Sequence, residues 1–269
     1  MPTVKQQVAE MMHGIRSGRL PSSETIVEEA FEELGYVPDR VTADEAKAYI
    51  NVMLHTAWER TLEVLERYER ETYGENVADA LVRHRAGDFR EAETISQRQG
   101  FSQAVRFLFS RWYPYLVEVF LSISQSRKQR GGKDFELQFG KMLSLMRIPH
   151  ERIDRKYRVD FIMPDSSTLA LNKTVAIIAS AKRTLRERWR EVVEELHNTR
   201  APNIFLITAD YDVGAGHVDQ ICDRYNIHLV VWDSVKEGLF PTRPLVVGYT
   251  SWANERIPAL RQFWPTEFR

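Results

Sequence analysis

The sequence contains a single cysteine, Cys222, among its 269 residues. One cysteine excludes an intrachain disulfide framework and a structural zinc site built from several cysteines. No stretch of 18 uncharged apolar residues occurs, which excludes a transmembrane helix. The first residues, MPTVKQQVAEMMHG, lack the apolar run of a secretory signal. These absences predict a protein of a reducing, cytoplasmic compartment without a membrane partner.

Net charge is also nearly absent, because 37 Lys and Arg face 38 Asp and Glu. The total conceals a split along the chain. Residues 1–126 carry 14 basic and 20 acidic side chains, residues 127–202 carry 17 and 10, and residues 203–269 carry 6 and 8. A basic segment between acidic neighbours indicates an anionic partner. A solvated, ion-paired surface would give the same composition.

The first 126 residues show helical periodicity. Thr42 precedes Ala-Asp-Glu as an N-cap should, and apolar residues then recur at helical spacing until a predicted helix end near Gly74. An aromatic-rich segment, 101–123, is interrupted by Pro114, which predicts a kink or a break. The aromatic residues between 107 and 120 are expected in the core of a buried helix pair.

The sequence pattern changes after residue 126. The polar, glycine-containing stretch SRKQRGGKD predicts a linker, and the pattern from Phe135 to Met146 predicts a helix. Continuous apolar strands then alternate with helical patterns near 184–197 and 215–225, which is typical of an α/β sheet covered on both faces. The predicted strands are 158–163, 174–180, 203–208 and 227–232. We therefore predict a helical domain over 1–126 and an α/β domain over 127–269.

Two residues of these strands carry the chemistry. Asp160 lies inside the first apolar strand, and Lys182 follows the second. If the two strands pair as a hairpin, the carboxylate and the ammonium come side by side. Phosphodiester hydrolysis needs this arrangement, with a carboxylate that holds a divalent cation and an ammonium near the attacking water. Hard oxygen ligands select Mg²⁺.

The helix predicted after Lys182 supplies further carboxylates. Glu187, Glu191 and Glu195 are spaced four residues apart and share one helix face. A carboxylate on this helix can replace one on the strand if it projects into the same cation site.

These residues together resemble the PD-(D/E)XK nuclease fold, in the variant of type II restriction endonucleases that cut CCGG or CCNGG. The resemblance covers about residues 127–235 and implies a restriction-endonuclease-like core with a mixed sheet flanked by helices. Ser180-Ala181-Lys182 fits the Ser/Thr-x-Lys motif, with Ser180 where other members of the fold carry a strand carboxylate. The resemblance makes Glu195 the displaced metal ligand, with Glu194 as the alternative.

The same family recognises its CC:GG steps with an Arg-Asp/Glu-Arg cluster, which Arg186-Glu187-Arg188 resembles. Arginine can bind guanine O6 and N7 bidentately, and glutamate can accept from cytosine N4. Glu187 is then a base-recognition residue and not a metal ligand. An alternative is that these arginines only form a solvated helix face paired with neighbouring glutamates.

Two further acidic positions remain open. Glu136 resembles the acidic residue that helps hold a metal on the helix before the hairpin, with Asp134 as the alternative. The dipeptide Pro164-Asp165 is expected from turn chemistry alone, so Asp160 is preferred as the catalytic aspartate.

The resemblance implies an Mg²⁺-dependent, sequence-specific DNA endonuclease of a prokaryotic restriction–modification system. Its partner would be double-stranded DNA with a palindromic target, cut to leave 5′ overhangs by a homodimer. The helical region 1–126 would serve dimerisation, a higher assembly or clamping of the DNA, and its acidic excess favours protein contacts. Two alternatives are a structure- or modification-dependent repair nuclease of the same fold and a non-catalytic DNA-binding module.

Overall fold

The computed structural model describes residues 2–152, 159–185 and 189–269. The chain divides into two compact units, which are described separately. The first, here called the arm, comprises residues 1–26 and 62–130. The second, here called the core unit, comprises residues 27–61 and 131–269.

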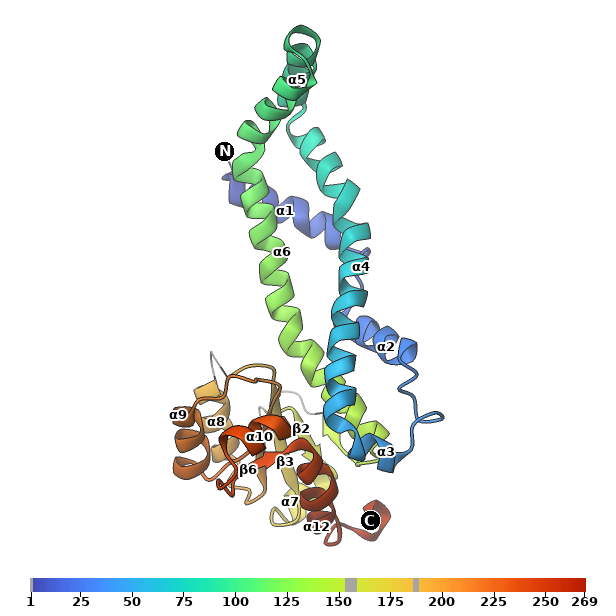
Figure 1. The fold of residues 1–269 in the computed structure, drawn as a ribbon, viewed down its shortest axis with the longest axis vertical. Coiled ribbons are helices and arrows are strands. Elements are labelled where there is room, and N and C mark those ends of the chain that lie inside the picture. Colours follow the sequence, from blue (N-terminus) through green and yellow to red (C-terminus); the bar gives the residue numbers. More distant parts are fainter. Residues whose placement is uncertain (1, 153–158, 186–188) are drawn as a thin grey trace. The chain divides into compact units, whose positions relative to one another are not determined.

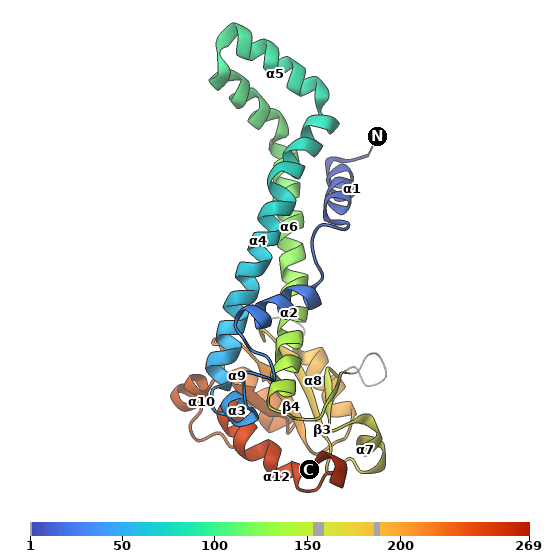
Figure 2. The same cartoon turned by 90° about the vertical axis from the view of Figure 1, so that its right-hand side faces the viewer.

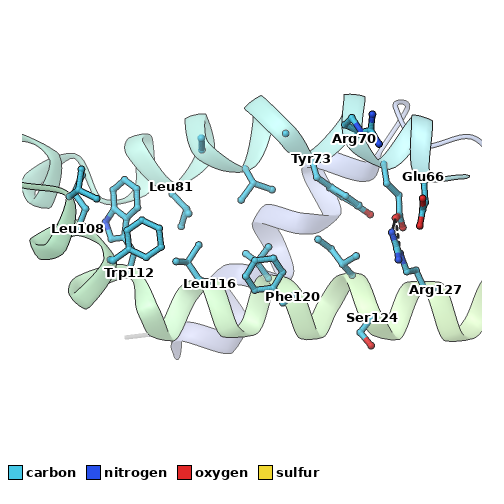
Figure 3. Close-up of a pocket in the computed structure, with 18 residues that line it drawn as sticks. Glu66, Arg70, Tyr73, Leu81, Leu108, Trp112, Leu116, Phe120, Ser124 and Arg127 are labelled. Carbon is cyan, nitrogen blue, oxygen red and sulfur yellow. Dashed lines mark hydrogen bonds and ion pairs between the residues drawn. The ribbon is translucent and has the colours of Figure 1, made fainter. Parts of the chain in front are cut away.

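The arm is helical. It contains α1 (Val4–Arg16), the C-terminal part of α4 (Ile50–His84), α5 (Ala86–Gln99) and the N-terminal part of α6 (Phe101–Leu145). In Figure 1 the arm parts of α4 and α6 run alongside one another and are joined through α5 at one end. Its small apolar core includes Met12, Leu81 and Val119. Arg127 on α6 donates from Nε and Nη2 to one and the same oxygen, Oε2, of the buried Glu69 on α4 (Figure 3).

Three aromatic residues of the arm part of α6 are exposed. Phe109, Tyr113 and Phe120 are 65%, 66% and 66% exposed, whereas the sequence predicted them in the core. The prediction is wrong for these three because the helix pair covers only one face of α6.

Helix α6 differs from the sequence prediction in two ways. It continues through Pro114 and through the predicted linker, so residues 126–134 are helical. Each helical glycine costs about 1 kcal/mol relative to alanine. Burial of Phe135 and Phe139 directly after Gly131 and Gly132 offsets this cost, since each large side chain contributes about 1.5–3 kcal/mol.

The core unit is built on a six-stranded mixed sheet in the order β1-β2-β3-β4-β5-β6. Strands β1 (Glu151–Arg152), β2 (Phe161–Met163) and β3 (Ile177–Lys182) pair antiparallel. Strands β3, β4 (Ile204–Thr208), β5 (His228–Val231) and β6 (Val246–Gly248) pair parallel. Almost every residue of β2 to β6 is buried, as expected of strands covered on both faces.

Helices connect and cover these strands (Figure 2). They are α7 (Ser166–Leu171), α8 (Trp189–Asn198), α9 (Ala215–Val218) with the π-helical turn Asp219–Arg224, α10 (Asp233–Leu239), α11 (Tyr249–Ser251) with the π-helical turn Trp252–Arg256, α12 (Ile257–Arg261) and a final 3₁₀ turn, Thr266–Phe268. Gly214 is the N-cap residue of α9 in the segment that follows β4, and Cys222 is buried.

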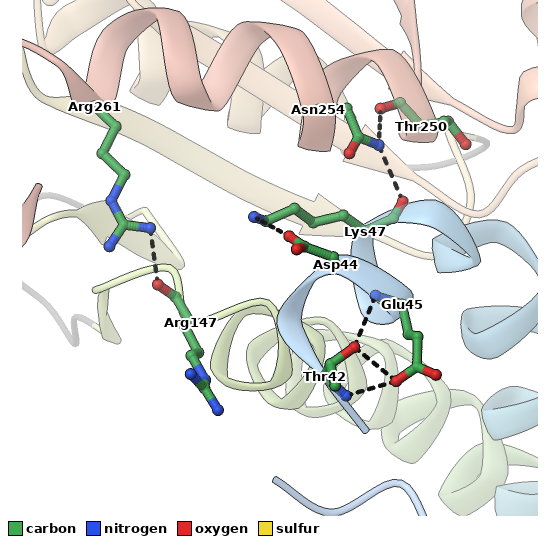
Figure 4. Close-up of polar contacts among 8 residues, drawn as sticks. All are labelled: Thr42, Asp44, Glu45, Lys47, Arg147, Thr250, Asn254 and Arg261. Carbon is green, nitrogen blue, oxygen red and sulfur yellow. Dashed lines mark hydrogen bonds and ion pairs between the residues drawn. The ribbon is translucent and has the colours of Figure 1, made fainter. Parts of the chain in front are cut away.

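Residues 27–61 group with the core unit, although the sequence placed them with the helical domain. They hold most of α2 (Ser23–Glu33), α3 (Ala43–Ala48) and the first turns of α4. Thr42 and Glu45 form the predicted N-cap of α3 as a capping box (Figure 4). Asn254 donates to the Lys47 carbonyl at 3.2 Å and joins α3 to the C-terminal helices.

A second polar joint lies at the start of α4. Asn51 donates to Asp233 Oδ2 at 2.7 Å and to Thr250 Oγ1 at 3.0 Å, and it accepts from the Asp233 amide. Thr250 N in turn donates to Asp233 Oδ1. These contacts attach α4 to the ends of β5 and β6, which sequence periodicity could not indicate.

Candidate active site

The β2–β3 pair brings Asp160 and Lys182 together, as predicted. Phe161 lies opposite Ala179, and the Asp160 amide donates to the Ala179 carbonyl at 3.2 Å. The Ala181 amide donates to Asp160 Oδ2 at 2.8 Å, which fixes the carboxylate against β3. The antiparallel register therefore places the carboxylate beside the last residue of β3.

Lys182 Nζ lies 2.9 Å from Asp160 Oδ2 and 2.9 Å from Glu136 Oε1. Glu136 comes from α6, directly after the buried Phe135, so packing of that helix against the sheet directs its carboxylate to the end of β3. The structure therefore gathers three of the residues that the sequence selected, from a helix and two strands.

The electrostatics of this group follow from partial burial. Burial alone would lower the pKa of Lys182, but the charges of Asp160 and Glu136 outweigh it and raise this pKa above its usual value. Burial raises the pKa of Glu136, and the negative charge of Asp160 raises it further, against the opposing effect of Lys182. The carboxylates of Asp160 and Glu136 thus share the ammonium of Lys182 in a partly buried site.

A divalent cation fits this donor set. Mg²⁺ is commonly held by one or two carboxylates, with water and substrate phosphate oxygens as its other ligands. Asp160 and Glu136 are two such carboxylates, and their mutual repulsion is what a cation relieves. Within residues 2–152, 159–185 and 189–269, no three His, Cys, Asp or Glu side chains form a cluster that could hold a metal.

Glu195 lies on α8, half-buried beside the buried Leu196, while Glu194 is exposed. Of the described residues, it does not form a three-ligand cluster with Asp160 and Glu136, so its role as a metal ligand stays a prediction. Ser180 is fully buried within β3.

The structure also shows where Asp165 and Asp134, the alternatives to Asp160 and Glu136, lie. Asp165 accepts from the Thr168 amide at 2.7 Å and caps α7, so its local role is the one expected from turn chemistry. Asp134 is buried on α6, and Lys182 donates to Glu136, two residues further along the helix.

Arg186, Glu187 and Arg188 lie outside the described residues. The segment leading to them is fixed by a residue that the sequence analysis missed. Buried Asp210 accepts from the Leu185 amide at 2.9 Å, and its own amide donates to Thr208 Oγ1. Thr208 pairs with Lys182 in the parallel register, so polar residues after β4 lie at the same edge of the sheet. That adjacency was the available signal for Asp210.

Arg183, next to the lysine, was also missed. Its guanidinium lies 4.9 Å from the ring centroid of Trp58 on α4, a cation–π contact. The side chain passes Gly131, where a Cβ would stand 3.6 Å from it. This is an ordinary van der Waals distance, so Gly131 packs beside Arg183 but the contact does not require glycine there.

Comparisons with known proteins agree with this geometry. Over 201 residues the chain is 28% identical to the type II restriction enzyme SsoII of Shigella sonnei, covering 69% of this chain and 60% of that enzyme. The fold is similar to metal-depleted Ecl18kI in complex with uncleaved, modified DNA, with a TM-score of 0.82 at 20% identity over 100% of this chain and 88% of that one. It is also similar to the restriction endonuclease PspGI in a substrate DNA complex, with a TM-score of 0.63 at 21% identity over 91% and 93% of the two chains.

The fold is therefore the PD-(D/E)XK nuclease fold predicted from the sequence, and the chain is homologous to type II restriction endonucleases. None of the helices in the described segments is long and apolar enough to cross a membrane. The model of the EcoRII C-terminal family matches residues 94–243, more than half of the sequence, so the chain belongs to this family.

Proposed function

We propose that this protein is an Mg²⁺-dependent endonuclease that cuts double-stranded DNA at a palindrome containing CC:GG steps, as a type II restriction enzyme of an intracellular restriction–modification system. The observation that carries the proposal is the contact of Lys182 Nζ with both Asp160 and Glu136 at the end of β3. A cation held by two carboxylates beside an ammonium is the arrangement that phosphodiester hydrolysis requires.

Each side chain has a distinct role in this proposal. Asp160 and Glu136 would hold Mg²⁺, with Glu195 as a further ligand, and the ion would supply Lewis-acid polarisation of the scissile phosphate. Lys182 orients the attacking water and stabilises the negative charge that develops on the phosphate. The Asp160 carboxylate is held by the Ala181 amide as well as by Lys182, so it is positioned before the substrate binds.

Specificity is assigned to Arg186, Glu187 and Arg188. Each bidentate arginine–guanine contact contributes about 1–3 kcal/mol of discrimination, and Glu187 would accept from cytosine N4. A palindrome presents two identical half-sites, so two copies of the chain would each present one arginine cluster. We expect cleavage that leaves 5′ overhangs, and both CCGG and CCNGG are candidate targets.

A digest of plasmid DNA tests the proposal. The protein is incubated with Mg²⁺ and with EDTA, and the DNA ends are sequenced. Discrete fragments that end at CCGG or CCNGG support restriction, whereas scattered nicks indicate a repair nuclease, and binding without cleavage indicates a non-catalytic DNA-binding module.

The recognition cluster has its own test. Arg186→Ala and Arg188→Ala should each lose discrimination between a CC:GG duplex and a duplex mismatched at one step. Arg190→Ala is the matched control, because Arg190 is exposed on α8 and its guanidinium lies over Trp189. Unchanged discrimination in the first two variants would refute the recognition role.

A further inference from the structure

Three residues join Lys182 to the recognition cluster of the proposed function, and the end of β4 holds both ends of this connection. The Leu185 amide donates to Asp210 Oδ2 at 2.9 Å. The Arg183 carbonyl accepts a longer contact, 3.5 Å, from the hydroxyl of Thr208. Thr208 and Asp210 are here called the clamp.

Asp210 uses each of its carboxylate oxygens to hold a different stretch of backbone. Oδ2 accepts from Leu185, and Oδ1 accepts from the Asp212 amide at 3.0 Å. The Asp210 amide donates to Thr208 Oγ1 at 3.1 Å, and both Asp210 and Leu185 are buried. Because a buried amide that loses its acceptor is costly, these contacts fix the position of Leu185. Asparagine could accept from only one of the two amides, since its side-chain nitrogen is a donor.

The clamp is itself held by buried aromatic residues from the two neighbouring strands. The Tyr249 hydroxyl, just after β6, donates to the Thr208 carbonyl at 3.0 Å. The Trp232 indole, just after β5, donates to the Ala209 carbonyl at 2.9 Å. Both side chains are buried, so the end of β4 is a fixed support for the connection.

The position of Lys182 does not depend on the side chains of the clamp. Its backbone pairs with that of Thr208 in the parallel register of β3 and β4. Its ammonium is held by Asp160 and Glu136. Removal of the Asp210 carboxylate would therefore release the Leu185 amide and leave the candidate catalytic group in place.

Base recognition tolerates little displacement of the residues that perform it. A binding constellation must be held within about 0.5 Å of its productive geometry by supporting hydrogen bonds. Leu185 directly precedes Arg186 in the sequence, and consecutive Cα atoms are about 3.8 Å apart. Freedom gained by the Leu185 backbone thus passes directly to the first residue of the cluster.

We propose that Asp210, supported by Thr208, is a positioning residue for base recognition. It sets the point from which the recognition cluster leaves the sheet, so it governs target affinity and discrimination and leaves the chemical step unchanged. The inference rests on the proposed function for the recognition role of Arg186, Glu187 and Arg188.

Single-turnover cleavage over a range of protein concentrations tests the inference. A CC:GG duplex and a duplex changed at one of these steps are compared, which gives a maximal rate and a half-saturating concentration for each. With the CC:GG duplex, Asp210→Ala should raise the half-saturating concentration about 10- to 100-fold, the worth of one bidentate arginine–guanine contact. Its discrimination between the duplexes should fall by a similar factor, while its maximal rate stays within about 3-fold of the wild type because Lys182 remains in place.

Asp212→Ala is the matched control for charge. Asp212 is exposed in the same loop and contacts Asp210 through its backbone amide, which alanine keeps. This variant removes the same charge as Asp210→Ala and should discriminate as the wild type does. An equal loss in Asp212→Ala would overturn the inference in favour of a general effect of charge on DNA binding.

The hydroxyl of Thr208 provides a second pair of variants. Thr208→Ser keeps the acceptor of the Asp210 amide, whereas Thr208→Val keeps the branched shape and removes that acceptor. The inference predicts that Thr208→Ser retains discrimination and that Thr208→Val loses part of it. The opposite order would indicate that Thr208 serves packing alone and would contradict its place in the clamp.

Hydrogen exchange of the full chain without DNA tests the clamp independently of what the protein cuts. In Asp210→Ala the peptide that contains the Leu185 amide should exchange faster, while the peptide covering Ile177–Lys182 keeps its wild-type protection. Thermal denaturation shows that each variant is folded at the assay temperature. Unchanged protection of the Leu185 amide would overturn the inference.

The cleavage assay separates the remaining outcomes. A wild type that does not distinguish the two duplexes rejects the proposed function. A wild type that distinguishes them, with an Asp210→Ala variant that does so equally well, rejects this inference alone. A variant with a reduced maximal rate and an unchanged half-saturating concentration also overturns it, because the clamp would then act on Lys182 instead of on recognition.

Discussion

Replacing Glu136 by glutamine separates the chemistry of the site from its stability. The carboxylate oxygen lies 2.9 Å from Lys182 Nζ, and the two side chains are 24% and 28% exposed. A hydrogen bond between charged groups contributes about 1.5–3 kcal/mol, and partial exposure reduces this to about 1–2 kcal/mol. Glutamine keeps the shape of the side chain but removes the charge that would hold Mg²⁺, and a loss of about 1–2 kcal/mol in transition-state stabilisation would slow cleavage by Glu136→Gln about 5- to 30-fold.

Stability should move in the other direction. Burial and the charge of Asp160 raise the pKa of Glu136, so the folded state disfavours the ionised carboxylate that is present at neutral pH. As the pH rises above the pKa that Glu136 has in the unfolded chain, ionisation of this carboxylate therefore lowers the stability of the wild type. Glutamine cannot ionise, so the variant lacks this loss of stability. In metal-free buffer at pH 7.5 the melting temperature of Glu136→Gln should therefore equal or exceed that of the wild type.

Single-turnover cleavage of a CC:GG duplex at saturating protein measures the rate, and thermal denaturation measures the stability. Glu28→Gln is the matched control, since Glu28 forms a 2.7 Å ion pair with Lys141 in the same unit. The control should cut at the wild-type rate. A Glu136→Gln variant that cuts normally, or that loses both activity and stability, would refute the role assigned to this carboxylate.

Three further variants and one reagent test the packing of the core unit. Gly248→Ala should destabilise the core unit by about 1–3 kcal/mol in urea titration, because its Cβ would collide with Asp233 Oδ1. Gly216→Ala, whose Cβ would meet nothing within 4 Å outside its own helix turn, should be neutral or stabilising by up to about 1 kcal/mol, and destabilisation equal to that of Gly248→Ala would contradict this account. Asn51→Ala should cost about 1–3 kcal/mol through the loss of its contacts with Asp233 and Thr250, and a neutral result would show that this joint is unimportant. Burial raises the pKa of Cys222 to about 12, so a thiol reagent at pH 8 should label it only after denaturation, and rapid labelling of the native protein would contradict its burial.

The strand pair of the site was predictable because its signals are local. Two apolar strands separated by a turn at Pro164-Asp165 predicted that Asp160 lies beside Lys182. The 2.9 Å distance between Lys182 Nζ and Asp160 Oδ2 confirms that the two strands pair in this way. Glu136 depended on a resemblance to known nucleases, because nothing in its own helix indicates which strand it faces.

The errors arose where contacts distant in sequence decide the structure. Gly131 and Gly132 favour a linker by local propensity, but burial of Phe135 and Phe139 keeps α6 helical through them. Residues 27–61 have the periodicity of any amphipathic segment, so only contacts such as Asn51 to Asp233 show that they group with the sheet. The exposed aromatics of α6 were assigned to the core because composition does not reveal which helix face is covered.

The central claim is that the Asp160–Lys182 pair cuts DNA. The most direct measurement is Mg²⁺-dependent cleavage of a CC:GG duplex by Lys182→Ala, with binding of the same duplex followed in parallel. Lys173→Ala serves as the control, since Lys173 is exposed and donates to the Thr199 carbonyl. The account predicts that Lys182→Ala binds the duplex and fails to cut it, while Lys173→Ala cuts at the wild-type rate. Normal cleavage by Lys182→Ala would contradict it.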